Sequence, residues 1–410
     1  MTTTRPPQRR PSTATRPAAQ AAEQQGPRTV VVAVRRLFAA ETPEYFLLLG
    51  TTLFLLAFGL IMVLSSSSIE SRAEGGGFFD KAGRQGLYAL VGIPAMLLAA
   101  RAPAAFWRRW AGTAVVIGVA LQLLVFLPGL GYSRGQNRNW INLGSFTAQP
   151  SELIKLALVL WLAWVLSRKG EALHEWREVA LPILPITIVT VGLVLAGNDL
   201  GTATIILAIV FGALFYAGVR LRILAAAGAG VALVALMAVQ LSDSRSNRIA
   251  AWLGQCSDPD LYSTDCWQSI HGWEALAHGG VFGVGLGNSS GKWSWIPEAA
   301  NDFIFAIIGE ELGMIGCVLV LLLFVVLAIC FVRIIRMNRD PFAKLVVSAA
   351  MVWIIGQAFV NIAVVLGLLP VLGVPLPLVS AGGSALITTL AAIGIVLSFA
   401  RHRPAGVPQR

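Results

Sequence analysis

Charged side chains are scarce in this sequence of 410 residues. Asp, Glu, Lys and Arg together make up 13% of it, whereas 56% of the residues are hydrophobic. A typical soluble domain has about 25% charged residues. The chain therefore lacks the polar surface that a water-soluble protein of this length needs, and a soluble enzyme or soluble binding module is excluded.

Cysteine and histidine are also rare, with four residues of each kind. No Cys or His spacing is typical of a zinc site, so the sequence predicts no metal centre built from these ligands. Cys256 and Cys266 lie in a segment that is predicted to face the outside of the membrane, where disulfides form. A bond between them is left open, because sequence spacing does not fix the geometry that a disulfide needs.

Apolar residues occur in blocks long enough to cross a lipid bilayer, which takes roughly 20 residues of helix. Inside the hydrocarbon core a segment must satisfy its own backbone hydrogen bonds, so each block is predicted to be a helix. The sequence thus predicts an all-α polytopic membrane protein with about ten transmembrane helices. The predicted spans are residues 45–64, 86–101, 111–131, 152–168, 180–197, 201–219, 222–241, 303–332, 343–366 and 384–400.

The distribution of Lys and Arg predicts the orientation of these spans. An even number of spans places both termini on one side of the membrane, and the tail and loops on that side hold most of the 31 basic residues. Cytoplasmic loops are enriched in Lys and Arg, so both termini are predicted to be cytoplasmic. The net charge of +10 then reflects contact with anionic lipid headgroups and requires no nucleic-acid partner.

Three regions follow from this topology. Residues 1–44 have few large apolar side chains and are predicted to form a disordered basic cytoplasmic tail. Residues 45–400 form the transmembrane domain, with a large extracytoplasmic loop, residues 242–302, between spans seven and eight. Residues 401–410 form a short cytoplasmic tail. The cytoplasmic loops are short, so any chemistry is expected outside the cytoplasm or within the membrane.

Ionisable residues gather at the start of the fourth span. Pro150 suits the first turn of a helix, and Glu152 and Lys155 then stand three residues apart on one helical face just inside the membrane. Ionisable residues in a membrane are candidates for function, and an internal ion pair is the structural alternative. Arg138 and Trp140 precede this span, and their structural alternative is to anchor the chain at the membrane interface.

The large loop ends with a glycine-rich segment followed by Lys292. A nucleotide-binding phosphate loop would need Gly in place of Leu286 and Ser or Thr in place of Trp293, so that interpretation fails. We expect the segment to bring Lys292 to the membrane surface instead.

Four carboxylates follow, namely Glu298, Asp302, Glu310 and Glu311. In a continuous helix Glu310 would lie about 80° around the axis from Asp302. Two carboxylates that face one sector of an apolar bundle are costly unless they are paired or functional. Lys155 and Arg138 are the expected partners.

An uncharged segment rich in Pro and Gly, residues 369–384, precedes the last span. Its backbone cannot form a regular helix, so at membrane depth it must be buried in protein or line a cavity. The N–H groups and hydroxyls of Ser380, Gly382 and Gly383 could bind phosphate oxygens there. A purely structural re-entrant turn is the alternative.

These segments together resemble the SEDS family (shape, elongation, division and sporulation), which contains the FtsW and RodA proteins. The resemblance covers roughly residues 45–400. It is carried by seven motifs in the family's order: Arg138-x-Trp140-x-x-Leu143-Gly144, Gln149-Pro150-Ser151-Glu152-x-x-Lys155, Asp199-Leu200-Gly201-Thr202, Gly285-x-Gly287-x-Ser289, Pro297-Glu298-x-x-x-Asp302-Phe303-Ile304-Phe305-Ala306, Gly309-Glu310-Glu311-x-Gly313 and Pro375-x-Pro377-x-x-Ser380-x-Gly382-Gly383-Ser384. The serine run at 65–68, Lys292-Trp293-x-Trp295 and Gly-Glu-Glu are more similar to the division-type FtsW branch than to RodA.

The resemblance implies a peptidoglycan glycosyltransferase that polymerises lipid II into glycan strands at the outer face of a bacterial plasma membrane during cell division. It also implies a class B penicillin-binding protein, which is the transpeptidase, and other division proteins as partners. Asp302 matches the essential carboxylate of the family and is expected to be the catalytic base. Arg138, Lys155 and Lys292 are candidates to stabilise the departing pyrophosphate.

The remaining candidates for substrate binding come from the same motifs. They are Trp140, Gln149, Ser151, Glu152, Asp199, Glu298, Glu310, Ser380, Gly382 and Gly383. The sequence identifies no cofactor, and a divalent cation such as Mg²⁺ or Mn²⁺ could share the neutralisation of the pyrophosphate, although the sequence has no dedicated cage of carboxylates for it. The chain departs from the family pattern at Gly197-Asn198, Val371 and Ala385, which weakens the substrate contacts expected of those two loops.

Two other functions fit the same residues. A transporter that flips lipid II across the bilayer would also use intramembrane charges and glycine-broken segments. It would need polar residues along the full depth of the membrane, whereas here they gather in the predicted outer half, which favours the enzyme. A scaffold that only recruits the transpeptidase would leave Asp302 dispensable.

Overall fold

The computed structural model describes residues 41–73, 77–134, 137–142, 144, 147–240, 243–256, 262–291 and 296–401, and most of them are helical. In chain order the elements are α2 (Pro43–Ala73), α3 (Asp80–Ala99), α4 (Ala104–Leu124), β1 (Gly131–Arg134), β2 (Asn137–Asn142), β3 (Thr147–Ala148), α5 (Pro150–Leu166), η1 (Gly170–His174), α6 (Trp176–Ala196), α7 (Leu200–Tyr216), α8 (Leu221–Gln240), α9 (Asp243–Trp252), η2 (Tyr262–Cys266), α11 (Trp267–Gly279), α12 (Ile304–Met337), α13 (Pro341–Val365) and α14 (Gly383–Ala400).

Each predicted span lies largely within one helix, from α2 to α8 and from α12 to α14. Five of these helices are long and apolar enough to cross a membrane: α2 over Pro43–Ser68, α6, α12, α13 and α14. The apolar stretches of α7, Leu200–Tyr216, and of α8, Leu221–Met237, are shorter. The chain is therefore a multi-pass membrane protein, while the number of ten spans stays a prediction.

Two helices, α2 and α4, end well away from the predicted ends of their spans. α2 continues through the serine run, because the hydroxyls of Ser66 and Ser67 donate back to the carbonyl of Val63 and so remain satisfied within a helix. α4 ends at Leu124, seven residues before the predicted end at 131, because Pro128-Gly129 favours a turn.

Residues 131–134, 137–142 and 147–148 form a small antiparallel sheet, which the all-α prediction missed. The strand order is β1-β2-β3, and Tyr132 of β1 pairs with Trp140 of β2. Alternate side chains of β2, those of Asn139 and Ile141, are buried. This segment is too short and polar to span a membrane, and the sheet supplies partners for its backbone N–H and C=O groups.

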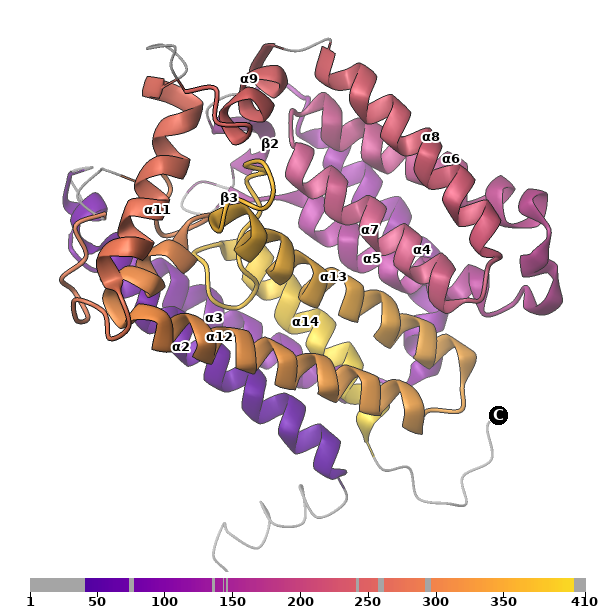
Figure 1. Cartoon of the computed structure of the whole chain (residues 1–410). Helices are drawn as coiled ribbons and strands as arrows, with labels where there is room; N and C mark the ends of the chain where they lie inside the picture. The colour runs from indigo at the N-terminus through magenta and orange to yellow at the C-terminus, as the bar shows by residue number, and fades with distance from the viewer. Residues whose placement is uncertain are drawn as a thin grey trace, which may run out of the picture. The chain divides into compact units, whose positions relative to one another are not determined.

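The interior of the bundle is formed by α5, α13 and α14, since most side chains of each are buried. α6 and α8 lie on one flank (Figure 1), and no described side chain of α8 is buried. An apolar helix with so little contact to protein fits a position that faces lipid.

The sheet, α9 and α11 gather at one end of the bundle, which we call the site end (Figure 1). At the opposite end the start of α2 meets the end of α14, where the hydroxyl of Thr42 donates to the carbonyl of Ala400 at 2.6 Å. The first predicted span therefore begins at the same end of the bundle at which the last one finishes, as an even number of crossings requires. The side of the membrane on which they do so stays a prediction.

α12 is interrupted at Gly313, whose φ of 68° and ψ of −165° are not helical. The glycine-rich segment after α11 fills the break: the N–H groups of Val284 and Gly285 donate to the carbonyls of Glu310 and Glu311 at 2.9 and 3.0 Å. A side chain at Gly313 would collide with the backbone of this inserted segment. Glycine is thus required there both by backbone conformation and by space.

Candidate active site

The connection between α13 and α14, residues 366–382, is the centre of the candidate site, and we call it the Pro-Gly loop. The hydroxyl of Ser380 donates to the carbonyl of Asn301 at 2.6 Å. The N–H of Ala381 donates to the carbonyl of Ala300 at 2.9 Å. The loop is therefore paired with the two residues that come directly before the predicted catalytic carboxylate.

Asp302 lies in a turn just before α12 and is half-buried. A Cβ atom added to Gly373 would be 3.5 Å from its Oδ2, so the carboxylate lies against the Pro-Gly loop. The side-chain amide of Asn361 donates to the carbonyls of Asp302 and Val374, at 2.8 and 2.7 Å. One buried amide thus holds the backbone of the predicted base and that of the loop together.

Asp302 does not share a helical face with Glu310, contrary to the prediction. The prediction assumed a continuous helix, but α12 begins at Ile304 and Asp302 belongs to a turn. The carbonyl of Glu298 accepts the N–H groups of Asn301 and Asp302 at 2.9 and 3.2 Å, and its carboxylate accepts the side-chain amide of Asn301. Glu298 therefore builds the turn that presents Asp302.

Glu310 is fully buried and surrounded by hydrogen-bond donors. Its carboxylate accepts from the hydroxyls of Ser289 and Ser290 and from the N–H groups of Ser290 and Gly291, and Nδ1 of His278 lies 3.2 Å away. A buried carboxylate is costly unless such partners satisfy it. Glu310 thus attaches the end of the inserted glycine-rich segment to α12, and the partners predicted for it, the cations, make none of these contacts.

The neighbouring carboxylate, Glu311, faces α2. The hydroxyl of Ser65 lies 2.7 and 2.6 Å from its two oxygens and donates to it. The serine run and the Gly-Glu-Glu motif, which distinguish the division-type branch in the sequence, are therefore in contact.

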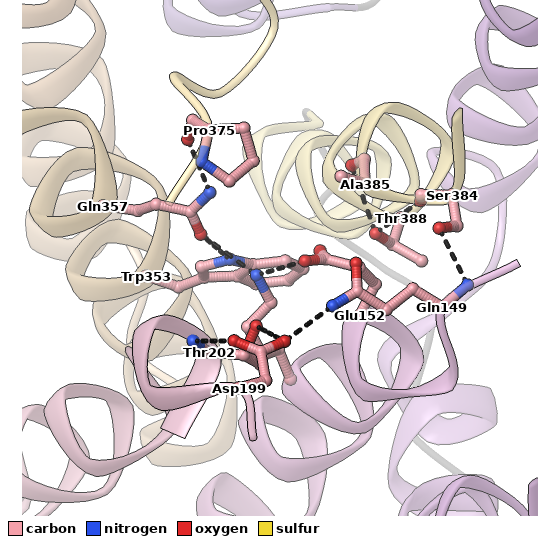
Figure 2. Close-up of polar contacts among 11 residues, drawn as sticks. Gln149, Glu152, Asp199, Thr202, Trp353, Gln357, Pro375, Ser384, Ala385 and Thr388 are labelled. Atoms are coloured by element: carbon pink, nitrogen blue, oxygen red, sulfur yellow. Dashed lines mark hydrogen bonds and ion pairs between the residues drawn. The ribbon is translucent and has the colours of Figure 1, made fainter. Parts of the chain in front are cut away.

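Glu152 and Lys155 form a buried ion pair on α5, with 2.8 Å between Nζ and Oε1 and side chains 3% and 2% exposed. The Nζ of Lys155 also donates to Oε1 of Gln357 at 3.0 Å and lies 5.1 Å from the centre of the Trp353 ring. The amide of Gln357 donates to the carbonyl of Pro375 at 2.9 Å (Figure 2). The internal ion pair considered as an alternative is thus present, and it connects α5 to the Pro-Gly loop.

The starts of α5, α7 and α14 meet beside this pair (Figure 2). The N–H of Gln149 donates to the hydroxyl of Ser384 at 3.1 Å, and its side-chain amide donates to Oδ2 of Asp199 at 2.8 Å. Asp199 caps α7, because its carboxylate accepts the N–H and the hydroxyl of Thr202, both at 2.8 Å. Ser151 is fully buried next to them, and its hydroxyl has no partner among the described residues.

Arg138 and Trp140 lie on β2 at the site end. The guanidinium of Arg138 is exposed, with Nη2 3.4 Å from the carbonyl of Phe126. The N–H of Arg138 and the side-chain amide of Asn139 both donate to the carbonyl of Gly197 at 2.8 Å. The sheet is thereby fixed to the turn that precedes α7.

The N–H groups of the Pro-Gly loop are largely used within the protein. The N–H of Gly382 donates to Oε1 of Gln85 at 3.1 Å, and the amide of Gln85 donates to the carbonyl of Ser380 at 3.1 Å. A side chain at Gly383 would collide with the ring of Tyr88. In this arrangement the hydroxyl of Ser380 and the N–H of Gly382 are hydrogen-bonded within the protein, as a re-entrant turn requires. The phosphate contact predicted for Ser380, Gly382 and Gly383 stays a prediction.

Three further expectations concern cysteines, a lysine and metals. Cys256 and Cys266 are joined by a disulfide with their Cα atoms 6.0 Å apart, which decides the pairing that the sequence left open. Lys292 lies outside the described residues. Among the described residues there is no group of three or more His, Cys, Asp or Glu side chains that could hold a metal ion.

Sequence reasoning missed the amide side chains that organise the site. Gln85 of α3, Asn139 of β2, and Gln357 and Asn361 of α13 are all buried and all bond to backbone carbonyls. A signal was available, because an amide within an apolar segment must find polar partners. The sequence does not show which carbonyls those partners are.

Residues 46–405 match the cell cycle protein family FtsW/RodA/SpoVE. A probable peptidoglycan glycosyltransferase FtsW of Mycobacterium tuberculosis is 39% identical over 364 residues, which cover 89% of this chain and 69% of that protein. Stage V sporulation protein E of Bacillus subtilis is 37% identical over 363 residues, 88% of this chain and 98% of that protein. A chain from a peptidoglycan synthase complex that coordinates polymerization and crosslinking superposes with a TM-score of 0.70 at 27% identity, covering 86% of this chain and 96% of the other.

Proposed function

This chain belongs to the FtsW/RodA/SpoVE family of cell cycle proteins, and from that membership we propose that it is a peptidoglycan glycosyltransferase that polymerises lipid II. The observation that carries the proposal is the placement of Asp302, a half-buried carboxylate held against the Pro-Gly loop at the site end. A carboxylate in such a position can accept a proton from a substrate that approaches from outside the bundle.

The proposed reaction is a single displacement. The 4-hydroxyl oxygen of one sugar forms a bond to the anomeric carbon of another, and undecaprenyl pyrophosphate leaves with the electrons of the broken bond. The configuration at that carbon inverts from α to β. Asp302 takes the hydroxyl proton, and a positioned base of this kind accelerates a reaction on the order of 10²–10⁴-fold.

The backbone of Asp302 is held in place by hydrogen bonds, as a catalytic base requires. Asn361 holds its carbonyl, and Glu298 holds its N–H, so the backbone is fixed on both sides of the side chain. A misplacement of about 1 Å can cost roughly 100-fold in rate. We therefore assign Asn361 and Glu298 to positioning.

The cations are assigned by their exposure. Arg138 is exposed on β2 and offers a guanidinium fork that matches two phosphate oxygens. Lys292 remains the second candidate for the pyrophosphate from its place in the sequence. Lys155 has three partners and is 2% exposed, so we assign it to hold Gln357, and through Gln357 the carbonyl of Pro375.

We further propose ten spans with both termini cytoplasmic, activity at the division septum, and a class B penicillin-binding protein as partner. The contact between Ser65 and Glu311 supports the division-type branch, because it joins the two motifs that distinguish it. The similarity to a chain of a peptidoglycan synthase complex supports the partner.

The decisive experiment supplies purified full-length protein in detergent with lipid II. A detergent micelle has no second leaflet, so a lipid transporter would yield no product there. We expect glycan strands that separate by length on a gel and disappear on digestion with a muramidase. If no strands form, with or without a co-purified transpeptidase, the proposed activity is wrong.

A further inference from the structure

The segment between α8 and α12 contains a covalently closed unit. Cys256, just after α9, is bonded to Cys266, the residue before α11. We call α9, η2 and α11 together the disulfide unit. A helix of only ten residues such as α9 is marginal by itself in water, so its place depends on what it is attached to. Here α9 contacts α8 and η2, and the disulfide links it covalently to the residue before α11.

Two tryptophans of this unit contact the start of the Pro-Gly loop. Nε1 of Trp252, the last residue of α9, donates to the carbonyl of Gly367 at 2.9 Å. A Cβ atom added to Gly367 would lie 2.6 Å from the ring of Trp273 of α11, so that ring lies directly on the glycine. Gly367 also has a φ of 76°, which disfavours any other residue. The loop thus begins at a glycine that both helices of the unit contact.

The same unit contacts the segment that carries Asp302. The side-chain amide of Gln268 donates to the carbonyl of Pro297 at 2.9 Å. A Cβ atom added to Gly272 would lie 2.8 Å from the ring of Phe303, so α11 packs closely on the residue next to Asp302. α11 therefore contacts both segments that meet at the predicted base, and α9 contacts one of them.

We propose that the disulfide unit is a clamp that positions the Pro-Gly loop relative to Asp302, with Trp252 and Trp273 as positioning residues. The disulfide holds α9 against α11, and the two tryptophans then keep Gly367 in register with Phe303. The contacts that form the clamp do not depend on the activity of the protein. The effect of the clamp on turnover rests on the proposed glycosyltransferase function.

Loss of the clamp should affect turnover more than substrate affinity. Arg138, the exposed candidate for the pyrophosphate, lies on β2, and its hydrogen bonds to described residues are with the carbonyls of Phe126 and Gly197, outside the disulfide unit. KM for lipid II should therefore change little. The value of kcat should fall, by up to about 100-fold if the loop shifts by about 1 Å relative to Asp302.

The first test removes the bond with Cys256→Ser/Cys266→Ser in the full-length protein. Hydrogen–deuterium exchange is measured in peptides covering 364–373 and 296–303, together with kcat and KM for strand synthesis. We expect faster exchange in both peptides and a lower kcat. Cys317→Ala changes a cysteine that is not in a disulfide and should leave every value as in the wild type.

A second variant, Trp252→Phe, keeps the disulfide and a large ring but removes the donor to Gly367. It should accelerate exchange at 364–373 and lower kcat less than the cysteine variant does. Trp176→Phe, at a 60% exposed position on α6, is its matched control. If the cysteine variant does not fold, Trp252→Phe alone tests whether the clamp exists.

Unchanged exchange at 364–373 and an unchanged kcat in Trp252→Phe would overturn the clamp. So would a folded cysteine variant in which exchange rises only within residues 243–266. If wild type makes no strands at all, the proposed function fails, but the exchange measurements still decide whether the clamp exists.

Discussion

The ion pair on α5 and the turn that carries Asp302 differ in how their charges meet solvent. Glu152 and Lys155 are 3% and 2% exposed and are paired with each other, whereas Asp302 is half-buried at the site end. A buried ion pair can hold neighbouring segments in place, but neither of its side chains can contact a substrate without breaking its own hydrogen bonds. We therefore propose that exposure, rather than the presence of a charge, distinguishes the residues that position the site from the proposed base.

The cost of enclosing charge strengthens this distinction. Two charges taken from water must regain their solvation from each other and from further hydrogen bonds. Lys155 has Glu152, Gln357 and the ring of Trp353 for this purpose. A lysine with three such partners is a fixed part of the bundle, and its connection to Pro375 through Gln357 gives it an indirect route to the loop.

The largest expected effect comes from the exposed side of the comparison. Asp302→Asn keeps the size of the side chain and the backbone bond to Asn361 but removes the base. We expect strand synthesis to fall on the order of 10²–10⁴-fold, with an unchanged thermal unfolding midpoint. Asp80→Asn, at an exposed carboxylate paired only loosely with Arg84, is the control. Substantial synthesis by purified Asp302→Asn would remove this residue from the reaction.

The buried side of the comparison is tested by breaking the pair in two ways. Lys155→Met alone leaves Glu152 buried without a counter-charge, which should destabilise the protein by about 3–5 kcal/mol. Glu152→Gln/Lys155→Met replaces the pair by two neutral side chains and should recover most of that loss. Unfolding in detergent and strand synthesis are measured on both. Lys169→Met breaks a more exposed pair with Glu178 and should cost about 1 kcal/mol or less.

The double variant separates the two roles of Lys155. Lys155→Met also removes the donor to Gln357, so if Lys155 positions the loop, the stable double variant should show faster hydrogen–deuterium exchange around Pro375 together with lower activity. A double variant that is stable and inactive but exchanges around Pro375 as the wild type does would instead mean that the ammonium group acts on substrate directly.

The smallest expected effect concerns the exposed cation. Arg138→Ala should lower kcat/KM for lipid II by about 10- to 100-fold, because a hydrogen bond to a charged group contributes about 1.5–3 kcal/mol. Arg138→Lys should lose less than Arg138→Ala but not match the wild type, since lysine lacks the guanidinium fork. Arg84→Ala, at an exposed arginine of α3, is the control. Equal losses in Arg138→Ala and Arg84→Ala, with Arg138→Lys close to the wild type, would argue for a general effect of surface charge.

The positions of the helices could be read from the sequence because lipid imposes a local rule. A segment in hydrocarbon must satisfy its backbone within itself, so an apolar block such as 343–366 predicts a helix whatever surrounds it, and α13 occupies Pro341–Val365. The pairing of Glu152 with Lys155 was also accessible as an alternative, because three residues along a helix bring side chains together.

The sheet, the break in α12 and the place of Asp302 were not accessible in this way. Each depends on a partner far along the chain: Gly197 for β2, the segment after α11 for Gly313, and Asn361 with the Pro-Gly loop for Asp302. No spacing or periodicity encodes such a partner.

The sequence by itself thus determined that this is a membrane protein built of apolar helices, and which motifs hold its polar residues. Only the tertiary structure decided which of those residues are enclosed and which can meet a substrate. The physical reason is that hydrophobicity acts on each segment separately, whereas the burial and pairing of a charge depend on every segment that packs around it.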